Sequence, residues 1–182
     1  MAGNPVLGFL EARPTGNDPH STVTKMLRLL GVAVLAWFAF AVLNNILQVA
    51  MGNAYLDGPG SAINAASAVV SIVISGAITA LVCWWITFTV TAWATNDPRG
   101  STHALVIGIL ATVFGGLGVL SALVGVGLGA AIFGAGVSAI YMVVGILTLL
   151  VSALECYCGI MILVNRSKTT QTATTRMGAA GN

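Results

Sequence analysis

The residues of this sequence that could do chemistry are concentrated in one stretch, "SALECYCGIMILVNR", residues 152–166. Glu155 is an acid inside an apolar run, and Cys156 and Cys158 follow it closely. An acid in such a run can hold a proton, bind a cation or pair with a basic group of another protein. The two cysteines are two positions apart, so on a helix they point to nearly opposite sides and make a poor metal site. We therefore expect no metal site and assign any chemistry to Glu155.

The composition indicates a protein embedded in a lipid bilayer. Of its 182 residues, 57% are hydrophobic and only 7% are charged, whereas about a quarter of the residues in a typical soluble domain are charged. Several apolar segments reach the roughly 20 residues that a helix needs to cross the bilayer core. The formal net charge of +2 is too small to indicate a nucleic-acid partner. The Gly-, Ala- and Thr-rich composition is typical of prokaryotes.

Four segments are predicted to be transmembrane helices, separated by polar or turn-forming residues. The predicted spans are residues 29–50, 62–93, 104–129 and 139–164. The second connection, "TNDPRGST", ends in Ser101 and Thr102, which we expect to cap the third helix. The third connection, residues 130–138, has no charged residue and is expected to be a short loop at the membrane surface. Residues 1–28 and 165–182 are predicted to be cytoplasmic tails, the second of them disordered.

The basic residues predict the orientation of the chain in the membrane. All seven fall before the first span, between the second and third, or after the fourth: Arg13, Lys25, Arg28, Arg99, Arg166, Lys168 and Arg176. These segments share one side of the membrane if there are four spans. Because loops rich in Lys and Arg stay in the cytoplasm, we expect both termini on the cytoplasmic side of the plasma membrane.

Small residues recur along one side of the third predicted helix, and a similar pattern follows in the fourth. In the third helix they are Gly108, Ala111, Gly115, Gly118, Ala122, Gly125 and Gly129. In the fourth helix the corresponding positions are Tyr141, Gly145, Thr148, Ser152, Glu155 and Gly159. Such rows let two helix backbones approach closely in lipid. We therefore predict an all-α integral membrane fold, a four-helix transmembrane bundle in which the third and fourth helices form an antiparallel hairpin. The same residues could instead join two chains.

Glu155 lies deep in the fourth predicted helix, on its small and polar side. It is nine residues from Val164, or about 14 Å at the helical rise, which is near the middle of a ~30 Å bilayer core. A charged carboxylate at that depth costs about 2.5–3.5 kcal/mol, and no Lys or Arg lies within a predicted span to offset it. Desolvation therefore favours the neutral acid.

Three roles for Glu155 are consistent with this position. The first is a structural hydrogen bond between the third and fourth helices, with Ser152, Thr148 and Thr112 as candidate partners. The second is a proton or cation site of a transporter or channel. The third is a contact with a basic residue of a partner protein. Intramembrane acids favour a functional role in general, and the spacing does not choose among the three.

The sequence contains no pattern typical of an enzyme. It has no nucleophile–base pair, no phosphate-binding loop, no metal-ligand cluster and no aqueous domain, so we expect neither catalysis nor a cofactor. Short loops and a long row of small residues favour a non-catalytic polytopic membrane protein. We expect it to be an accessory or structural subunit of a larger membrane complex, or a homo-oligomer. The alternative is a small proton- or cation-coupled transporter or oligomeric channel that uses Glu155.

Overall fold

The structure, a computed structural model, describes residues 19–53, 59–132 and 135–180, and these ranges are helical apart from one tight turn. The helices are α2 (Pro19–Asn53), α3 (Pro59–Ala94), α4 (Pro98–Ile132) and α5 (Ala135–Ala180). Each contains a segment of 28 to 34 residues that is long and apolar enough to cross a membrane. The prediction of an all-α protein with four potential membrane spans is confirmed, and the chain is a multi-pass membrane protein.

The helices extend beyond the predicted spans. The helix α5 continues through residues 165–180, which we expected to form a disordered tail. No Pro or Gly lies between Asn165 and Met177, so the sequence offers no signal that would end the helix at the membrane surface. The third connection is also shorter than the expected residues 130–138, because α4 reaches Ile132 and α5 begins at Ala135. Residues 133–134 themselves lie outside the described part of the chain.

The turn between α3 and α4 is closed by Asp97 rather than by Ser101 and Thr102, so the expected helix cap is wrong. The Arg99 N–H donates to Oδ1 of Asp97 across 2.8 Å, and Pro98 is the first residue of α4. An acid at the N-cap followed by proline at the first helical position is a strong start signal. The helix therefore starts at Pro98, and the hydroxyl residues Ser101 and Thr102 lie inside it.

The chain also reverses direction tightly at this turn. Asn96 has a φ of 57°, in the left-handed region that Asn tolerates better than most residues. At Gly100 an added Cβ would lie 2.6 Å from the backbone nitrogen of Trp93. Glycine therefore lets the first turn of α4 pack directly on the last turn of α3.

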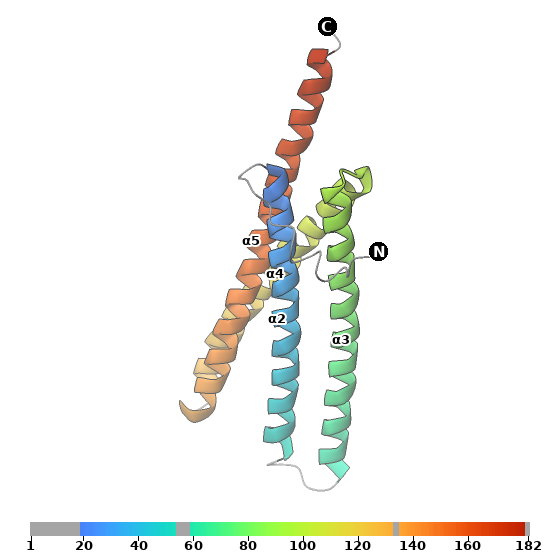
Figure 1. The fold of residues 1–182 in the computed structure, drawn as a ribbon. Coiled ribbons are helices and arrows are strands. Elements are labelled where there is room, and N and C mark those ends of the chain that lie inside the picture. Colours follow the sequence, from blue (N-terminus) through green and yellow to red (C-terminus); the bar gives the residue numbers. More distant parts are fainter. Residues whose placement is uncertain (1–18, 54–58, 133–134, 181–182) are drawn as a thin grey trace.

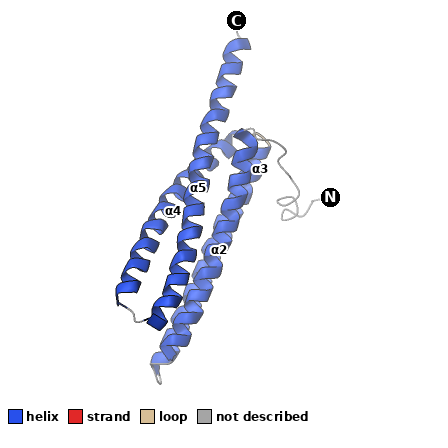
Figure 2. Cartoon of the chain, turned by 90° about the vertical axis from the view of Figure 1, so that its left-hand side faces the viewer, coloured by secondary structure: helices blue, strands red, loops and turns tan. Residues whose placement is uncertain are grey.

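The four helices are arranged as two antiparallel pairs (Figure 1). The helices α2 and α3 lie side by side, and α4 and α5 form the second pair, which makes the most extensive contact in the described structure. Figure 2 shows the second pair lying against α2, with α5 extending past the other helices at its C-terminal end. The contact between α2 and α5 joins the two pairs.

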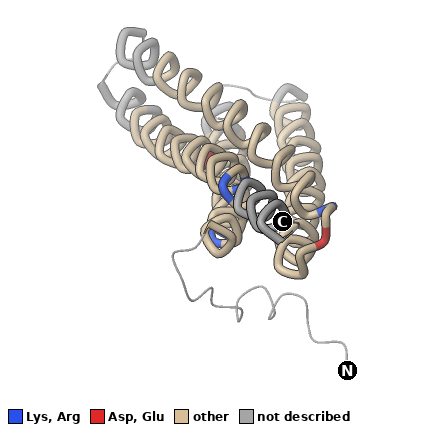
Figure 3. Tube along the Cα trace, turned by 90° about the horizontal axis from the view of Figure 1, so that it is seen from above, with Lys and Arg blue, Asp and Glu red and all other residues tan. Residues whose placement is uncertain are grey.

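Most of the buried residues lie at the end of the bundle where α2 and α4 begin, which we call the basic end. Its core consists of Val23, Leu27, Leu30, Ile86, Val90, Trp93, Ala104, Ile107, Cys158 and Ile162. Lys25, Arg28, Arg99 and Arg166 belong to the same end, and Figure 3 shows Lys and Arg in blue around it. Two hydrogen bonds from Arg166 Nε to Ser101, 2.8 Å to its carbonyl oxygen and 3.1 Å to Oγ, join α5 to α4 there.

A second link at the basic end joins α2 to α3. The His20 ring stacks on the Trp93 indole with 5.1 Å between ring centroids. The Trp93 indole N–H donates to the His20 carbonyl across 3.1 Å, and His20 Nε2 donates to the Trp93 carbonyl across 3.0 Å. These reciprocal bonds fix the start of α2 against the finish of α3.

The opposite end of each helix packs far less tightly within the chain. We call these segments the far halves: residues 38–47 of α2, 61–81 of α3, 117–125 of α4 and 142–151 of α5. Within them, Ala68 and Ala122 are the only buried residues. The bundle is therefore well packed at the basic end and loosely packed at the other.

Candidate functional site

Helices α4 and α5 meet backbone to backbone along glycines. A Cβ added to Gly115 would lie 2.5 Å from the Cys156 backbone nitrogen, and one added to Gly159 would lie 2.6 Å from that of Thr112. Real Cβ atoms do not approach other atoms so closely. Gly108 faces the Leu163 side chain, 3.0 Å from where its Cβ would be. The structure thus brings Gly108 and Gly115 of α4 against the face of α5 that contains Gly159.

The close contact does not include every small residue of the pattern. Gly118 faces Ser152, and Ala122 is buried, but Gly125 is exposed with nothing within 4 Å of an added Cβ. Gly145 is half-buried on α5. The surroundings of Gly129 lie outside the described structure. The seam therefore closes tightly in the middle of the bundle and toward the basic end.

Glu155 lies beside this seam and faces the interior of the bundle. The residue is only 9% exposed. The Trp37 indole on α2 lies near the Glu155 carboxyl. The same indole reaches the seam, with one ring carbon 3.9 Å from where a Cβ of Gly118 would be. The acid is thus enclosed between α2, α4 and α5.

The hydroxyl groups that the sequence suggested as partners are not hydrogen bonded to Glu155. The Thr112 hydroxyl donates to the Gly108 carbonyl of its own helix across 2.8 Å, a bond that threonine commonly makes inside helices. The Ser152 hydroxyl is fully buried against Gly118 and has no hydrogen-bond partner among the described residues. Thr148 is half-buried two turns before Glu155.

Trp37 is a site residue that the sequence analysis did not identify. One signal could have indicated it: Trp37 lies about as far along α2 from Arg28 as Glu155 lies along α5 from Arg166. The two side chains therefore share a depth in the bilayer. Depth alone does not show which helix faces which, and that information comes from packing.

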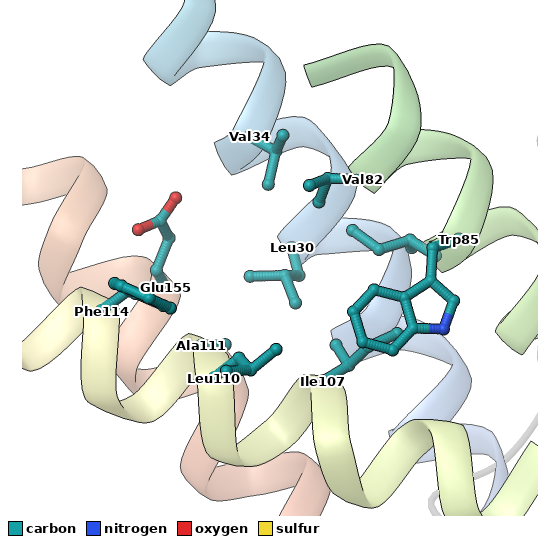
Figure 4. Close-up of a pocket in the computed structure, with 10 residues that line it drawn as sticks. Leu30, Val34, Val82, Trp85, Ile107, Leu110, Ala111, Phe114 and Glu155 are labelled. Atoms are coloured by element: carbon teal, nitrogen blue, oxygen red, sulfur yellow. The ribbon is translucent and has the colours of Figure 1, made fainter. Parts of the chain in front are cut away.

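Glu155 also lines a cavity of about 190 Å³ to which all four helices contribute (Figure 4). The other lining residues are all apolar or aromatic: Leu30, Val34, Val82, Trp85, Ile86, Ile107, Leu110, Ala111 and Phe114. In Figure 4 Glu155 of α5 lies on one side and Trp85 of α3 on the other, with Leu30 of α2 between them. The cavity is therefore an apolar space with one acidic group in its wall.

Trp85 is held in place by a residue outside the cavity. Its indole N–H donates to Nδ1 of His103, on α4, across 3.1 Å. The His103 ring also meets the rings of Trp85 and Phe88 edge to face, with centroid separations of 6.2 Å and 5.3 Å. Because the indole nitrogen is turned away from Glu155 (Figure 4), Trp85 presents carbon atoms to the cavity.

The cysteines do not gather at the site. Cys158 is fully buried in the core of the basic end, while Cys83 and Cys156 are half-buried, and all three are free thiols. In the part of the chain that the structure describes, no three His, Cys, Asp or Glu residues lie close enough together to hold a metal ion. Glu155 is therefore the chemically distinctive group of the membrane-spanning region.

Comparison with known proteins identifies no relative from which a function could be transferred. No family model, curated protein or solved structure matches the chain. The functional inferences consequently come from Glu155, its cavity and the packing of the four helices.

Proposed function

We propose that this chain is a small, non-catalytic, multi-pass protein of a prokaryotic plasma membrane that works as a subunit of a homo-oligomer or of a larger membrane complex. The observation that supports this proposal is the loose packing of the far halves. In an 18-residue apolar stretch of α3 only 6% of the residues are buried in the chain, against 22% in the corresponding stretch of each of the other three helices. Since helices in lipid associate by van der Waals packing, such segments suit contacts with further helices.

The distribution of charge supports a further part of the proposal, which is the orientation of the chain in the membrane. Lys25, Arg28, Arg99 and Arg166 all belong to the basic end of the bundle. The positive-inside tendency favours placing this end, and both termini, in the cytoplasm. The loosely packed far halves then lie toward the outer leaflet, and a partner subunit would meet the chain there.

Site-specific photo-crosslinking in the native membrane tests the subunit proposal. The photoreactive residue p-benzoylphenylalanine replaces Val73, which is 65% exposed in the far half of α3, or Val32, which is 56% exposed on α2 near the basic end and serves as the matched control. We expect a discrete adduct at position 73 and none at position 32. The mass of the adduct distinguishes a second copy of this 18.5 kDa chain from a larger partner. Equal labelling at both positions, or a monomer without adducts, would contradict the proposal.

The cavity supports a second candidate function, a proton- or cation-coupled transporter or channel that uses Glu155. The supporting observation is the place of Glu155, which is buried within its own chain, lines the cavity and lies near Trp37. A carboxyl so placed suits an internal ion better than a basic residue on a neighbouring protein. Proton and cation flux in liposomes tests this function: we expect flux with the wild type and its loss in Glu155→Gln. Equal flux in both would exclude it.

A further inference from the structure

The chemistry of the cavity distinguishes among the cations that Glu155 could bind. Inorganic ions such as Ca²⁺ take six to eight oxygen ligands, and Mg²⁺ requires near-octahedral coordination. Of the ten residues that line the cavity, Glu155 is the only one whose side chain carries oxygen. The other nine cannot replace the hydration shell of a metal ion. The cavity is thus poorly suited to an inorganic cation.

The same walls are well suited to an organic cation. Aliphatic side chains bury hydrocarbon, and the faces of aromatic rings attract ammonium groups. Phe114 supplies such a ring on the Glu155 side of the cavity and Trp85 supplies one in the opposite wall, and Trp37 lies near the carboxyl. A ligand with an ammonium group at one end and an apolar body would satisfy the carboxylate and fill the remaining space.

The volume limits the size of that ligand. A cavity of about 150 Å³ lined by aliphatic and aromatic side chains holds one benzene molecule, and this cavity measures about 190 Å³. One six-membered ring with a short aminomethyl arm therefore fits. A second ring would extend out of the cavity on its open, lipid-facing side.

The position of the cavity is consistent with entry from the bilayer. Phe114 is 63% exposed and Leu110 is 38% exposed, so the α4 side of the cavity borders the lipid. Amines with an apolar body partition into membranes, where they meet this wall.

We propose that the cavity is a binding site for a small lipophilic ammonium ion, a primary amine on a ring-sized apolar body, with the Glu155 carboxylate as its counter-charge. The cavity walls, rather than the charge alone, then select the ligand. This inference rests on the cation site of the second candidate function and names its ligand class. It is independent of the subunit proposal.

Fluorine NMR of 4-fluorobenzylamine, titrated into the full-length protein in lipid nanodiscs, tests the inference. The neutral analogue 4-fluorobenzyl alcohol has the same ring and nearly the same size. We expect saturable binding of the amine to the wild type, beyond that of empty nanodiscs, and affinity for the alcohol that is about thirtyfold or more weaker. Such a loss is typical when one partner of a buried charge pair is removed. This comparison needs no variant and is unaffected by misfolding.

Two substitutions then locate the site. Glu155→Gln should reduce the affinity for the amine, but not for the alcohol, by about thirtyfold or more. Ala111→Leu should abolish binding of both compounds because it fills the cavity, whereas Ala153→Leu, the same change at an exposed position of α5, should leave binding unchanged.

Absence of saturable binding to the wild type, equal affinity for amine and alcohol, or equal binding to wild type and Glu155→Gln would each overturn the inference. Flux that depends on Glu155 without amine binding would overturn it and leave the second candidate function standing. Amine binding without flux would leave the inference standing and exclude the second candidate function.

Discussion

Trp85 of α3 and His103 of α4 are joined by a hydrogen bond of 3.1 Å, from the indole N–H to Nδ1. The bond fixes the indole that forms the wall of the cavity opposite Glu155. It also connects the two helices that make the smallest contact among the four main pairings of the described helices. Because Nδ1 accepts this hydrogen bond, the imidazole carries its proton on Nε2 when it is neutral.

Removing the acceptor should destabilise the bundle. We expect His103→Leu to lower the free energy of unfolding by about 1 kcal/mol, because the half-buried Trp85 N–H then has no partner. Adding Trp85→Phe removes the donor as well and should recover part of that loss. Unfolding of the single and double variants in mixed detergent micelles measures both effects. Additive losses in the double variant would show that the two side chains do not interact.

The start of α4 gives a second prediction, which separates two assignments of the helix cap. Asp97→Ala should cost about 1 kcal/mol, because it removes the acceptor for the Arg99 N–H. Thr102→Ala alters an exposed residue inside the helix and should change stability little. The same unfolding measurement compares the two variants. A larger loss in Thr102→Ala would restore the cap that we expected from the sequence alone.

The apolar spans could be predicted from the sequence because bilayer thickness sets a minimum length of apolar residues. The ends of the helices could not be predicted in this way, since hydropathy indicates where the apolar bilayer core ends and not where the backbone hydrogen bonds of the helix end. At α5 the helix continues into residues 165–180, because nothing in that stretch breaks it. At α4 the structure places the cap at Asp97, where proline and acid act together.

The glycines of the seam give a third prediction with an adjacent control. Gly115→Ala should lower stability by about 1–3 kcal/mol, because its Cβ would meet the backbone of Cys156. Gly116→Ala places the same methyl group where nothing lies within 4 Å and should be neutral or mildly stabilising. Unfolding of both variants, with helix content followed by circular dichroism, checks the difference. Equal effects would mean that α4 and α5 are not in close contact at Gly115.

The site was only partly predictable for a related reason. Glu155 is identifiable because an acid in an apolar run is costly wherever it faces. Its surroundings depend on how α2 is rotated and on which helix it packs against. Small-residue spacing carries such information for α4 and α5, but α2 has no comparable pattern. Trp37 therefore enters the site only once the helices are assembled.

Trp37 provides the last prediction, on how the carboxyl is held. Trp37→Phe keeps an aromatic ring against the seam but removes the indole N–H, which we expect to interact with Glu155. We expect a loss of about 0.5–1.5 kcal/mol in unfolding free energy, the usual value of one hydrogen bond. Trp84→Phe is the control, because Trp84 is 69% exposed on α3 and faces away from the bundle. If Glu155→Leu is introduced first, the effect of Trp37→Phe should shrink toward that of the control, since the acceptor has already been removed. A loss that persists in the Glu155→Leu background would instead assign Trp37 to ring packing alone.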